Sequence, residues 1–364
     1  DMELDGGNSV LKSTSPAGDV GVMPAELQLA GSSFPGTRGV PVRLVLLLGA
    51  VSLFVYARCL SASFINLDDH SYVLKNPMVH AGLCRESVQW AWTTFACGNW
   101  HPLVWMTLLA DRSLFGADAW GYHLTNVVLH ALNTVVLFLA VWEFTGAKWR
   151  AAFVALLFSV HPQHVESVAW ISERKDVLSG LFWMLSLWSY ARWARRAEAW
   201  MWWCSLASLV IGLTAKQMLV TLPCVLVLMD IWPLQRWSGR LWGRGEGPDR
   251  NQSEANAGGT PAATSSLAGL VFEKWPMFVA IVVAMMVVIQ AQASSGAIGR
   301  LDYLGWGDRV RTALTSYGLY LALFVWPIPL TVFYPYHYAD FGWTGALISA
   351  GATALLVLVC WRYR

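Results

Sequence analysis

The sequence has few charged residues and lacks the motifs of several common protein classes. Asp, Glu, Lys and Arg make up only 13% of its 364 residues, and the net charge is +2. The basic residues form no dense cluster, so a nucleic-acid partner is not indicated. The six cysteines show no CxxC spacing and no HExxH motif occurs, which argues against a zinc site and a dense disulfide framework.

Hydrophobic residues are abundant instead. They make up 56% of the chain, and 22 residues are tryptophans, whose amphipathic ring is favoured at membrane interfaces. A helix needs about 20 apolar residues to cross a bilayer. We therefore predict an all-α polytopic membrane protein with about eight transmembrane helices, near residues 41–60, 122–144, 150–160, 177–194, 199–215, 217–233, 275–293 and 343–361.

Positive charges at the ends of these runs predict the orientation. Under this assignment they gather on one side of the membrane, which the positive-inside rule makes the cytoplasm. The residues concerned are Arg38, Arg43, Lys148, Arg150, Arg192, Arg195, Arg196, Arg236, Arg240, Arg244, Arg362 and Arg364. Residues 312–330 are also apolar, but crossing there would place the last two arginines outside. We expect this segment to form a helix along the outer face.

The remaining segments define the domain organisation. Residues 1–36 are rich in Gly, Ser, Pro and Ala and are predicted to be a disordered tail. Residues 37–364 form the membrane domain, and residues 236–274 are a polar cytoplasmic linker within it. Two long outer loops follow from this topology, at about 61–121 and 294–342. In the first, residues 88–95 and 103–115 are amphipathic and suit helices at the interface.

Asp68 and Asp69 lie in this first outer loop, close to the end of the first apolar run. Carboxylates next to hydrocarbon are costly unless they serve binding or proton transfer, which makes the pair a candidate catalytic site. A solvated pair in a loop is the alternative.

A second group of polar residues occupies the short outer loop at 161–176. Five charged side chains at the bilayer centre would cost about 2.5–3.5 kcal/mol each, so they must face water. These are Glu166, Glu173, Arg174, Lys175 and Asp176. With Lys216, the two basic residues of this loop are suited to surround an anion. Two structural roles are the alternatives to anion binding: Asp176 caps the N-terminus of a helix, and Lys216 extends its ammonium group to the membrane interface.

His161, His164 and Glu166 also have a spacing at which side chains can converge on a metal ion. The alternative is that the two histidines form hydrogen bonds that shape a polar pocket, because no strong zinc signature is present. We predict that no cofactor is required and keep these three residues as weak metal candidates.

A set of motifs covers most of residues 60–340. They are FINLDD at 64–69 with Asn76 and Pro77, HPL at 101–103, GYHLTN at 121–126 with His130, HPQHVE at 161–166, SERKD at 172–176, Lys216, and FYP at 333–335. In these motifs the chain resembles a known family: the GT-C-fold membrane glycosyltransferases, and among them the bacterial O-mannosyltransferase-like proteins that carry tetratricopeptide repeats.

The resemblance implies a GT-C-like helical bundle with amphipathic outer-face helices in the first and last long loops. It implies transfer of a mannose-like sugar from a polyprenyl-phosphate donor to a hydroxyl of a protein or glycan acceptor. The reaction inverts the anomeric carbon on the extracytoplasmic face, here the periplasmic side of a bacterial inner membrane. Membrane lipid and the lipid-linked sugar are the implied partners.

The resemblance also assigns roles to residues. One of the first-loop carboxylates, Asp68 or Asp69, acts as the base and the other positions the acceptor. Arg174, Lys175 and Lys216 bind the donor phosphate, because cations stabilise the charge of a departing phosphate. The pocket residues are His101, His123, His161, His164, Glu166 and Tyr334.

The chain departs from this family because it has no 34-residue helical repeat and ends at Arg364, directly after an apolar run. We therefore expect a fragment or a truncated form, in which acceptor binding by a missing part is lost. Two other classes stay open: a transporter or flippase for a lipid-linked or anionic solute, and a noncatalytic membrane scaffold. The absence of an internal repeat disfavours the transporter.

Overall fold

The computed structural model describes residues 39–237, 239, 265–296, 305–328, 330–331 and 342–362. In this part of the chain all regular structure is helical, and pairing between extended segments is limited to one isolated bridge, Trp237 with Ser265. The tail predicted for residues 1–36 lies outside the described residues. Each of the eight predicted apolar runs contains a helix: α1 (Val42–Val55), α5 (Ala119–Thr145), α6 (Lys148–Val160), α8 (Arg174–Arg196), α9 (Ala199–Leu213), α10 (Leu222–Ile231), α13 (Trp275–Ser294) and α15 (Trp343–Arg362).

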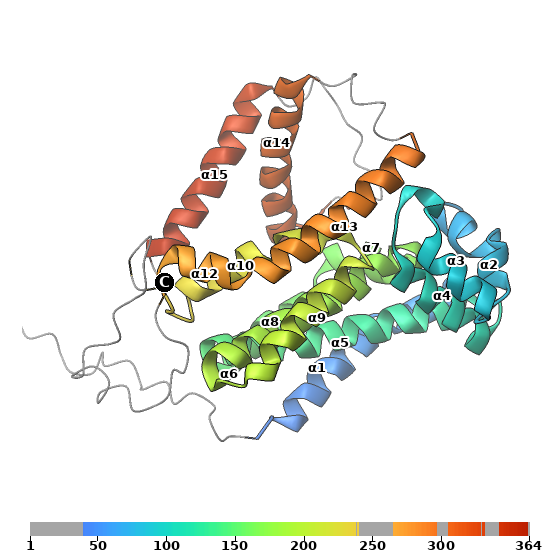
Figure 1. The fold of residues 1–364 in the computed structure, drawn as a ribbon, viewed down its shortest axis with the longest axis horizontal. Coiled ribbons are helices and arrows are strands. Elements are labelled where there is room, and N and C mark those ends of the chain that lie inside the picture. Colours follow the sequence, from blue (N-terminus) through green and yellow to red (C-terminus); the bar gives the residue numbers. More distant parts are fainter. Residues whose placement is uncertain are drawn as a thin grey trace, which may run out of the picture. The chain divides into compact units, whose positions relative to one another are not determined.

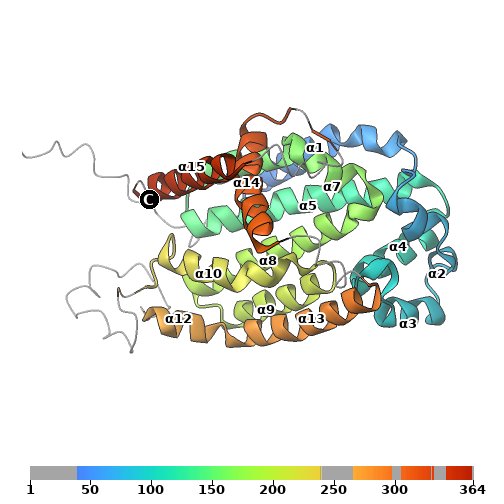
Figure 2. The same cartoon turned by 90° about the horizontal axis from the view of Figure 1, so that it is seen from above.

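The centre of the fold is formed by α5 and α8, which pack against each other along their lengths (Figures 1 and 2). The far side of α8 contacts α9, while α5 also contacts α1 and α6. Buried side chains between α8, α9 and α10, including Leu187, Leu209 and Leu226, form one apolar core. Polar residues are buried there too. The hydroxyl oxygens of Ser186 and Ser205 lie 2.8 Å apart and form a hydrogen bond across the α8–α9 contact.

Three of the described helices, α5, α13 and α15, are long and apolar enough to cross a membrane by length and composition. This number is smaller than the eight predicted crossings, because several runs form shorter helices. The 15 residues of α9 rise about 23 Å, less than the roughly 30 Å of a hydrocarbon core. The 23-residue α8 is long enough, but it begins and ends with charged residues. The helices support an all-α membrane protein.

The first outer loop is largely helical. Its elements are η2 (Ala57–Ser61), the π-helical turn η3 (His70–Leu74), α2 (Pro77–His80), α3 (Arg85–Thr93), η4 (Ala96–Gly98) and α4 (Pro102–Phe115). The stretches predicted as amphipathic, 88–95 and 103–115, fall largely within α3 and α4. These helices pack around the fully buried indole of Trp105, which contacts Trp90 at 5.0 Å between ring centroids.

The short outer loop is also structured. It consists of η5 (Pro162–His164), α7 (Val165–Ala169) and η6 (Ile171–Glu173), which lead directly into α8. The segment predicted to lie along the outer face forms α14 (Trp306–Val325), which is not among the three candidate spans. This helix ends before Pro327, and it packs against α15 (Figure 1).

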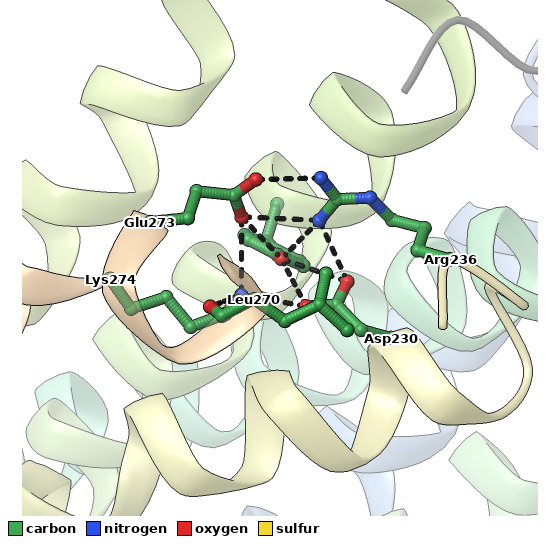
Figure 3. Close-up of polar contacts among 6 residues, drawn as sticks. Asp230, Arg236, Leu270, Glu273 and Lys274 are labelled. Carbon is green, nitrogen blue, oxygen red and sulfur yellow. Dashed lines mark hydrogen bonds and ion pairs between the residues drawn. The ribbon is translucent and has the colours of Figure 1, made fainter. Parts of the chain in front are cut away.

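A cluster of ionised residues joins the ends of the segment predicted as a linker (Figure 3). Arg236 contacts Asp230 at 2.9 Å and Glu273 at 2.7 Å, and Lys274 contacts Asp230 at 2.6 Å. The Tyr190 hydroxyl of α8 donates to Asp230 at 2.7 Å. Glu273 ends the short helix α12 (Leu267–Glu273), so the described ends of the 236–274 segment are packed, unlike the polar loop predicted there. Residues 240–264 lie outside the described residues.

Candidate functional site

The two adjacent carboxylates, Asp68 and Asp69, have different surroundings. Asp69 is fully buried, and its Oδ1 accepts hydrogen bonds from the backbone N–H and the hydroxyl of Ser172. Its Oδ2 accepts from the backbone N–H of Ile65 at 3.0 Å. The neighbouring Asp68 is exposed to solvent. Asp69 therefore fastens the first outer loop to the segment before α8, and Asp68 is held at the surface beside it.

Asp68 lies close enough to Tyr72 and Cys97 to act on both electrostatically. Burial raises the pKa of Tyr72, and the nearby Cys97, Asp68 and Glu173 raise it further. The pKa of Cys97 is raised by burial and by Asp68. The Nζ of Lys175 lies 5.7 Å from the centre of the Tyr72 ring. A carboxylate and an ammonium group thus border the same aromatic side chain.

Arg174 is buried, contrary to the phosphate-binding role predicted for it. Its guanidinium is fully buried, pairs with Asp111, and donates to Asn126 Oδ1 and to the Tyr122 carbonyl at 2.7 Å each. Asp111 also accepts from Thr125 at 2.7 Å. Because every guanidinium nitrogen has a protein acceptor, this side chain joins α4, α5 and α8 and is not free to bind a phosphate.

Lys175 and Lys216 are partly exposed, and both approach carboxylates. Lys175 contacts Glu173 at 2.7 Å, while Lys216 pairs with Asp176 and lies 3.9 Å from Glu173. Burial and the charges of Glu173 and Asp176 raise the pKa of Glu166, whereas Lys216 and Lys175 lower it. The structure therefore brings Glu166, Glu173, Lys175, Asp176 and Lys216 together, and these five residues form the charged group.

The predicted pocket histidines are distributed over separate places. His101 is buried, stacks on Tyr72 with ring centroids 5.5 Å apart, and also contacts Trp105. Burial and Lys175 lower its pKa to about 3, so it is neutral at physiological pH. His123 is fully buried in α5. His101 thus belongs to the aromatic cluster of Tyr72 and Trp105. Tyr334 lies outside the described residues.

His161 and His164 begin the short loop and pack against aromatic rings. The Nε2 of His161 bonds to the Phe324 carbonyl of α14 at 2.9 Å, and its Nδ1 accepts from the backbone N–H of Gln163. His164 lies 4.3 Å from Phe158 between ring centroids, and burial lowers its pKa to about 4. With both nitrogens engaged, His161 fits a joint between α14 and the short loop better than a metal ligand. No group of three or more His, Cys, Asp or Glu residues in the described ranges could hold a metal ion.

An apolar groove of about 700 Å³ adjoins the charged group. Leu67, directly before Asp68, lies in one wall, and Glu166 contributes a carboxylate. Leu323 of α14 also lines it. The groove can accept a long apolar chain, and Glu166 places a charged side chain in its lining. Its other lining residues are Ile65, Pro162, Gln163, Val165, Ala169, Trp170, Tyr320, Leu330 and Thr331.

Sequence reasoning missed Asp111 and Tyr72. Asp111 is a single acid within the apolar helix α4, and such an isolated charge signals a buried partner. Tyr72 carried no comparable signal, because an aromatic residue in a Trp-rich loop is unremarkable by itself.

Parts of the chain are similar in sequence to known proteins. Residues 101–242 match the family described as dolichyl-phosphate-mannose-protein mannosyltransferase. Protein O-mannosyl-transferase TMTC1 of Mus musculus is 34% identical over 167 residues, which cover 42% of this chain and 17% of that protein. The Homo sapiens TMTC1 protein is 32% identical over 166 residues, covering 42% and 18%. Protein O-mannosyl-transferase Tmtc2 of Drosophila melanogaster is 27% identical over 196 residues, covering 50% and 21%.

The matched part of the chain thus spans about a fifth of the length of these relatives. No solved structure matches. The family match includes Lys175 and Lys216 but begins after Asp68. The resemblance predicted from the motifs is confirmed: the chain is similar to the membrane mannosyltransferases of the dolichyl-phosphate-mannose-protein mannosyltransferase family and to the protein O-mannosyl-transferases.

Proposed function

We propose that this protein transfers mannose from a polyprenyl-phosphate carrier to a hydroxyl of a protein acceptor at a membrane surface. The observation that carries the proposal is the exposed carboxylate of Asp68, which acts with Lys175 on the same pair of residues, Tyr72 and Cys97, and directly follows Leu67 in the lining of a 700 Å³ apolar groove. A lipid-linked sugar phosphate needs these three features together: an apolar channel, a cation and a base. The names of the relatives support the sugar and the protein acceptor.

We place the site on the extracytoplasmic face of a GT-C-like bundle in which all eight apolar helices are embedded. The shorter helices then reach across the hydrocarbon core together with their flanking turns, as η7 (Gln217–Thr221) extends α10. The N-terminus and the cluster around Arg236 lie on the cytoplasmic side. The distance along α8 from Arg174 to Tyr190 is 16 residues, or about 24 Å, which separates the two ends by most of a hydrocarbon core. A bacterial inner membrane stays a prediction, since the relatives named above come from animals.

In the proposed reaction Asp68 is the general base. Its carboxylate takes the proton of the acceptor hydroxyl while the acceptor oxygen forms a bond to the anomeric carbon. The bond from this carbon to the phosphate oxygen breaks on the opposite side, so the configuration inverts, and the polyprenyl phosphate leaves with the electron pair. General-base catalysis of this kind contributes about 10² to 10⁴ in rate.

Lys175 and Lys216 are the proposed phosphate ligands. An ammonium group has three N–H donors, so pairing with Glu173 or Asp176 leaves donors for phosphate oxygens. The carboxylates hold the two ammonium groups in place before the donor arrives. Arg174 acts only indirectly, because its contacts with Asp111 and Asn126 fix the start of α8 and hence the direction of Lys175.

The apolar groove is the proposed site of the first isoprene units of the donor. Leu67 and Leu323 give it apolar walls, and the carboxylate in its lining, Glu166, interacts electrostatically with Lys216 and Lys175. The phosphate would then lie where the groove meets the charged group.

The decisive experiment measures mannose transfer from polyprenyl-phosphate mannose to an acceptor peptide by the protein in liposomes. Asp68→Asn should lower kcat by at least about a hundredfold, because an amide cannot take the proton. Asp118→Asn is the matched control, since Asp118 is also exposed in the outer loop and makes no side-chain cap bond. Full activity of Asp68→Asn would contradict the base. The absence of transfer by the wild type, with uptake of the lipid instead, would favour a transporter.

We further propose that the reaction needs no metal ion, since the leaving phosphate is served by two lysines. A chelator should leave transfer unchanged. Loss of activity that a divalent cation restores would contradict this proposal. Glu166 and its neighbouring carboxylates would then be the candidate metal ligands.

A further inference from the structure

A second cavity lies among the helices of the bundle, and the proposed reaction assigns it no role. It has a volume of about 230 Å³ and lies between α5, α6, α8 and the start of α7. A water molecule occupies about 30 Å³ of liquid, so the cavity is large enough for several waters or one small ligand. Its walls combine apolar surfaces, such as Trp183 and Met218, with a few polar groups.

The most informative polar group is the side-chain amide of Asn133 on α5. Its residue is 2% exposed, and its Nδ2 donates to the Val177 carbonyl at 2.7 Å. Its Oδ1 has no hydrogen-bond partner among the described residues. Buried polar atoms are nearly always paired, so this oxygen calls for a donor from a bound molecule. A Cβ at Gly180, which also lines the cavity, would lie 3.4 Å from Oδ1, so the free oxygen points to this part of the wall.

The cavity is connected to the charged group through Asp176. This residue lines the cavity, pairs with Lys216 through Oδ1, and accepts from Ser167 through Oδ2 at 3.2 Å. His164 lines the cavity as well and is neutral at physiological pH. The polar atoms facing the cavity are thus mostly acceptors or neutral groups, and an ammonium group lies just beyond them.

We propose that this cavity is a monosaccharide-binding subsite, which holds the pyranose ring of a sugar. Hydroxyl groups of the ring donate to Asn133 Oδ1 and Asp176, and its C–H face packs against Trp183. A purely apolar ligand would leave Oδ1 unpaired, and an anion would meet the Asp176 carboxylate. The proposal rests on the proposed mannosyltransferase function, and it assigns the sugar to a place that the base and the phosphate ligands do not define. The sugar can come from the lipid donor or from a mannosylated peptide product.

Gly180→Ala is the test variant. Its new methyl group would be in ordinary van der Waals contact with Asn133 Oδ1 and would block the approach of a hydroxyl. The fold should tolerate this change, because alanine is favoured over glycine within a helix. Gly49→Ala is the matched control: Gly49 lies in α1, where a Cβ would be 3.7 Å from a methyl carbon of Val135, and it does not line the cavity.

The experiment measures binding of paired probes to the full chain in detergent. One pair is short-chain prenyl-phosphate mannose and the same prenyl phosphate without sugar; the other is a mannosylated peptide and its unmodified form. We expect the wild type and Gly49→Ala to prefer the sugar-bearing member of one pair by about tenfold. Gly180→Ala should lose this preference, while its affinity for the sugar-free member and its thermal stability stay unchanged or rise. The pair that responds identifies the source of the sugar.

Two results would overturn the subsite. One is an equal affinity of the wild type for both members of each pair, and the other is a sugar preference that survives in Gly180→Ala. In either case binding of the sugar-free prenyl phosphate would leave the proposed function intact. A wild type that neither binds prenyl phosphate nor transfers mannose would contradict the proposed function itself, and the subsite with it.

Discussion

Replacing Asp69 with alanine tests whether the two adjacent carboxylates divide their work as the structure indicates. The variant removes an acceptor that holds the backbone N–H of Ser172 at 2.9 Å and that of Ile65 at 3.0 Å. A hydrogen bond to a charged group contributes about 1.5–3 kcal/mol, and the partly buried Ile65 bond belongs at the low end. The expected loss from the two backbone bonds is about 3–4.5 kcal/mol. This is a large part of the roughly 5–15 kcal/mol typical of folded proteins.

The assay is equilibrium unfolding in mild detergent, with the free energy of unfolding obtained from a denaturant titration. Asp68→Ala is the internal control, because truncation of an exposed side chain should change stability by no more than about 0.5 kcal/mol. The reasoning is refuted if Asp69→Ala is as stable as Asp68→Ala. It is also refuted if Asp68→Ala is the less stable of the two, since Asp68 would then be the structural residue.

Three further predictions concern the surroundings of this pair. Arg174→Ala should lose about 3–5 kcal/mol of unfolding free energy, because it leaves Asp111 buried and unpaired, and the double variant Arg174→Met with Asp111→Leu should recover much of this loss in the same titration. The folded-state pKa of His101 is lowered from 6.5 to about 3, so its contribution to stability is present above pH 6.5 and is lost as the pH falls toward 3. His101→Phe should flatten the stability curve over that window, and an unchanged slope would show that His101 is not responsible. Lys175→Ala and Lys216→Ala should each raise the KM for the lipid donor about tenfold, while the exposed Lys75→Ala should not; equal effects at all three positions would indicate only the overall charge of the outer face.

Hydropathy located the helices well, because the signal for a buried or membrane-embedded helix is local. Helices occur at all eight predicted apolar runs, and α14 covers most of the segment 312–330 that was also expected to be helical. The extent of each helix was harder to predict. The run at 199–215 ends in a turn that starts at Thr214, because the backbone there bonds within a tight turn instead of continuing α9.

The direction of neighbouring side chains could not be read from the sequence. Successive residues on a helix point about 100° apart. Arg174 and Lys175 therefore face different surroundings, and which one turns inward depends on Asp111, 63 positions earlier in the chain. The same holds for Asp68 and Asp69, since the partner that buries Asp69 is Ser172, 103 positions away. A sequence pattern identifies such residues as a group, but only the packed structure assigns each its neighbours.

The cluster around Asp230 and Arg236 has a practical consequence for experiments on this protein. The backbone N–H of Ser265 donates to the Arg236 carbonyl at 2.8 Å, so the chain leaves and re-enters the described fold at adjacent points. Lys274 and Glu273 fasten the returning end to α8 and α10 through the same cluster (Figure 3). A rigid soluble domain grafted between residues 240 and 264 would thus have both of its connections anchored. In the proposed topology such a graft would lie outside the membrane and would supply the mass that electron microscopy needs to orient a small protein.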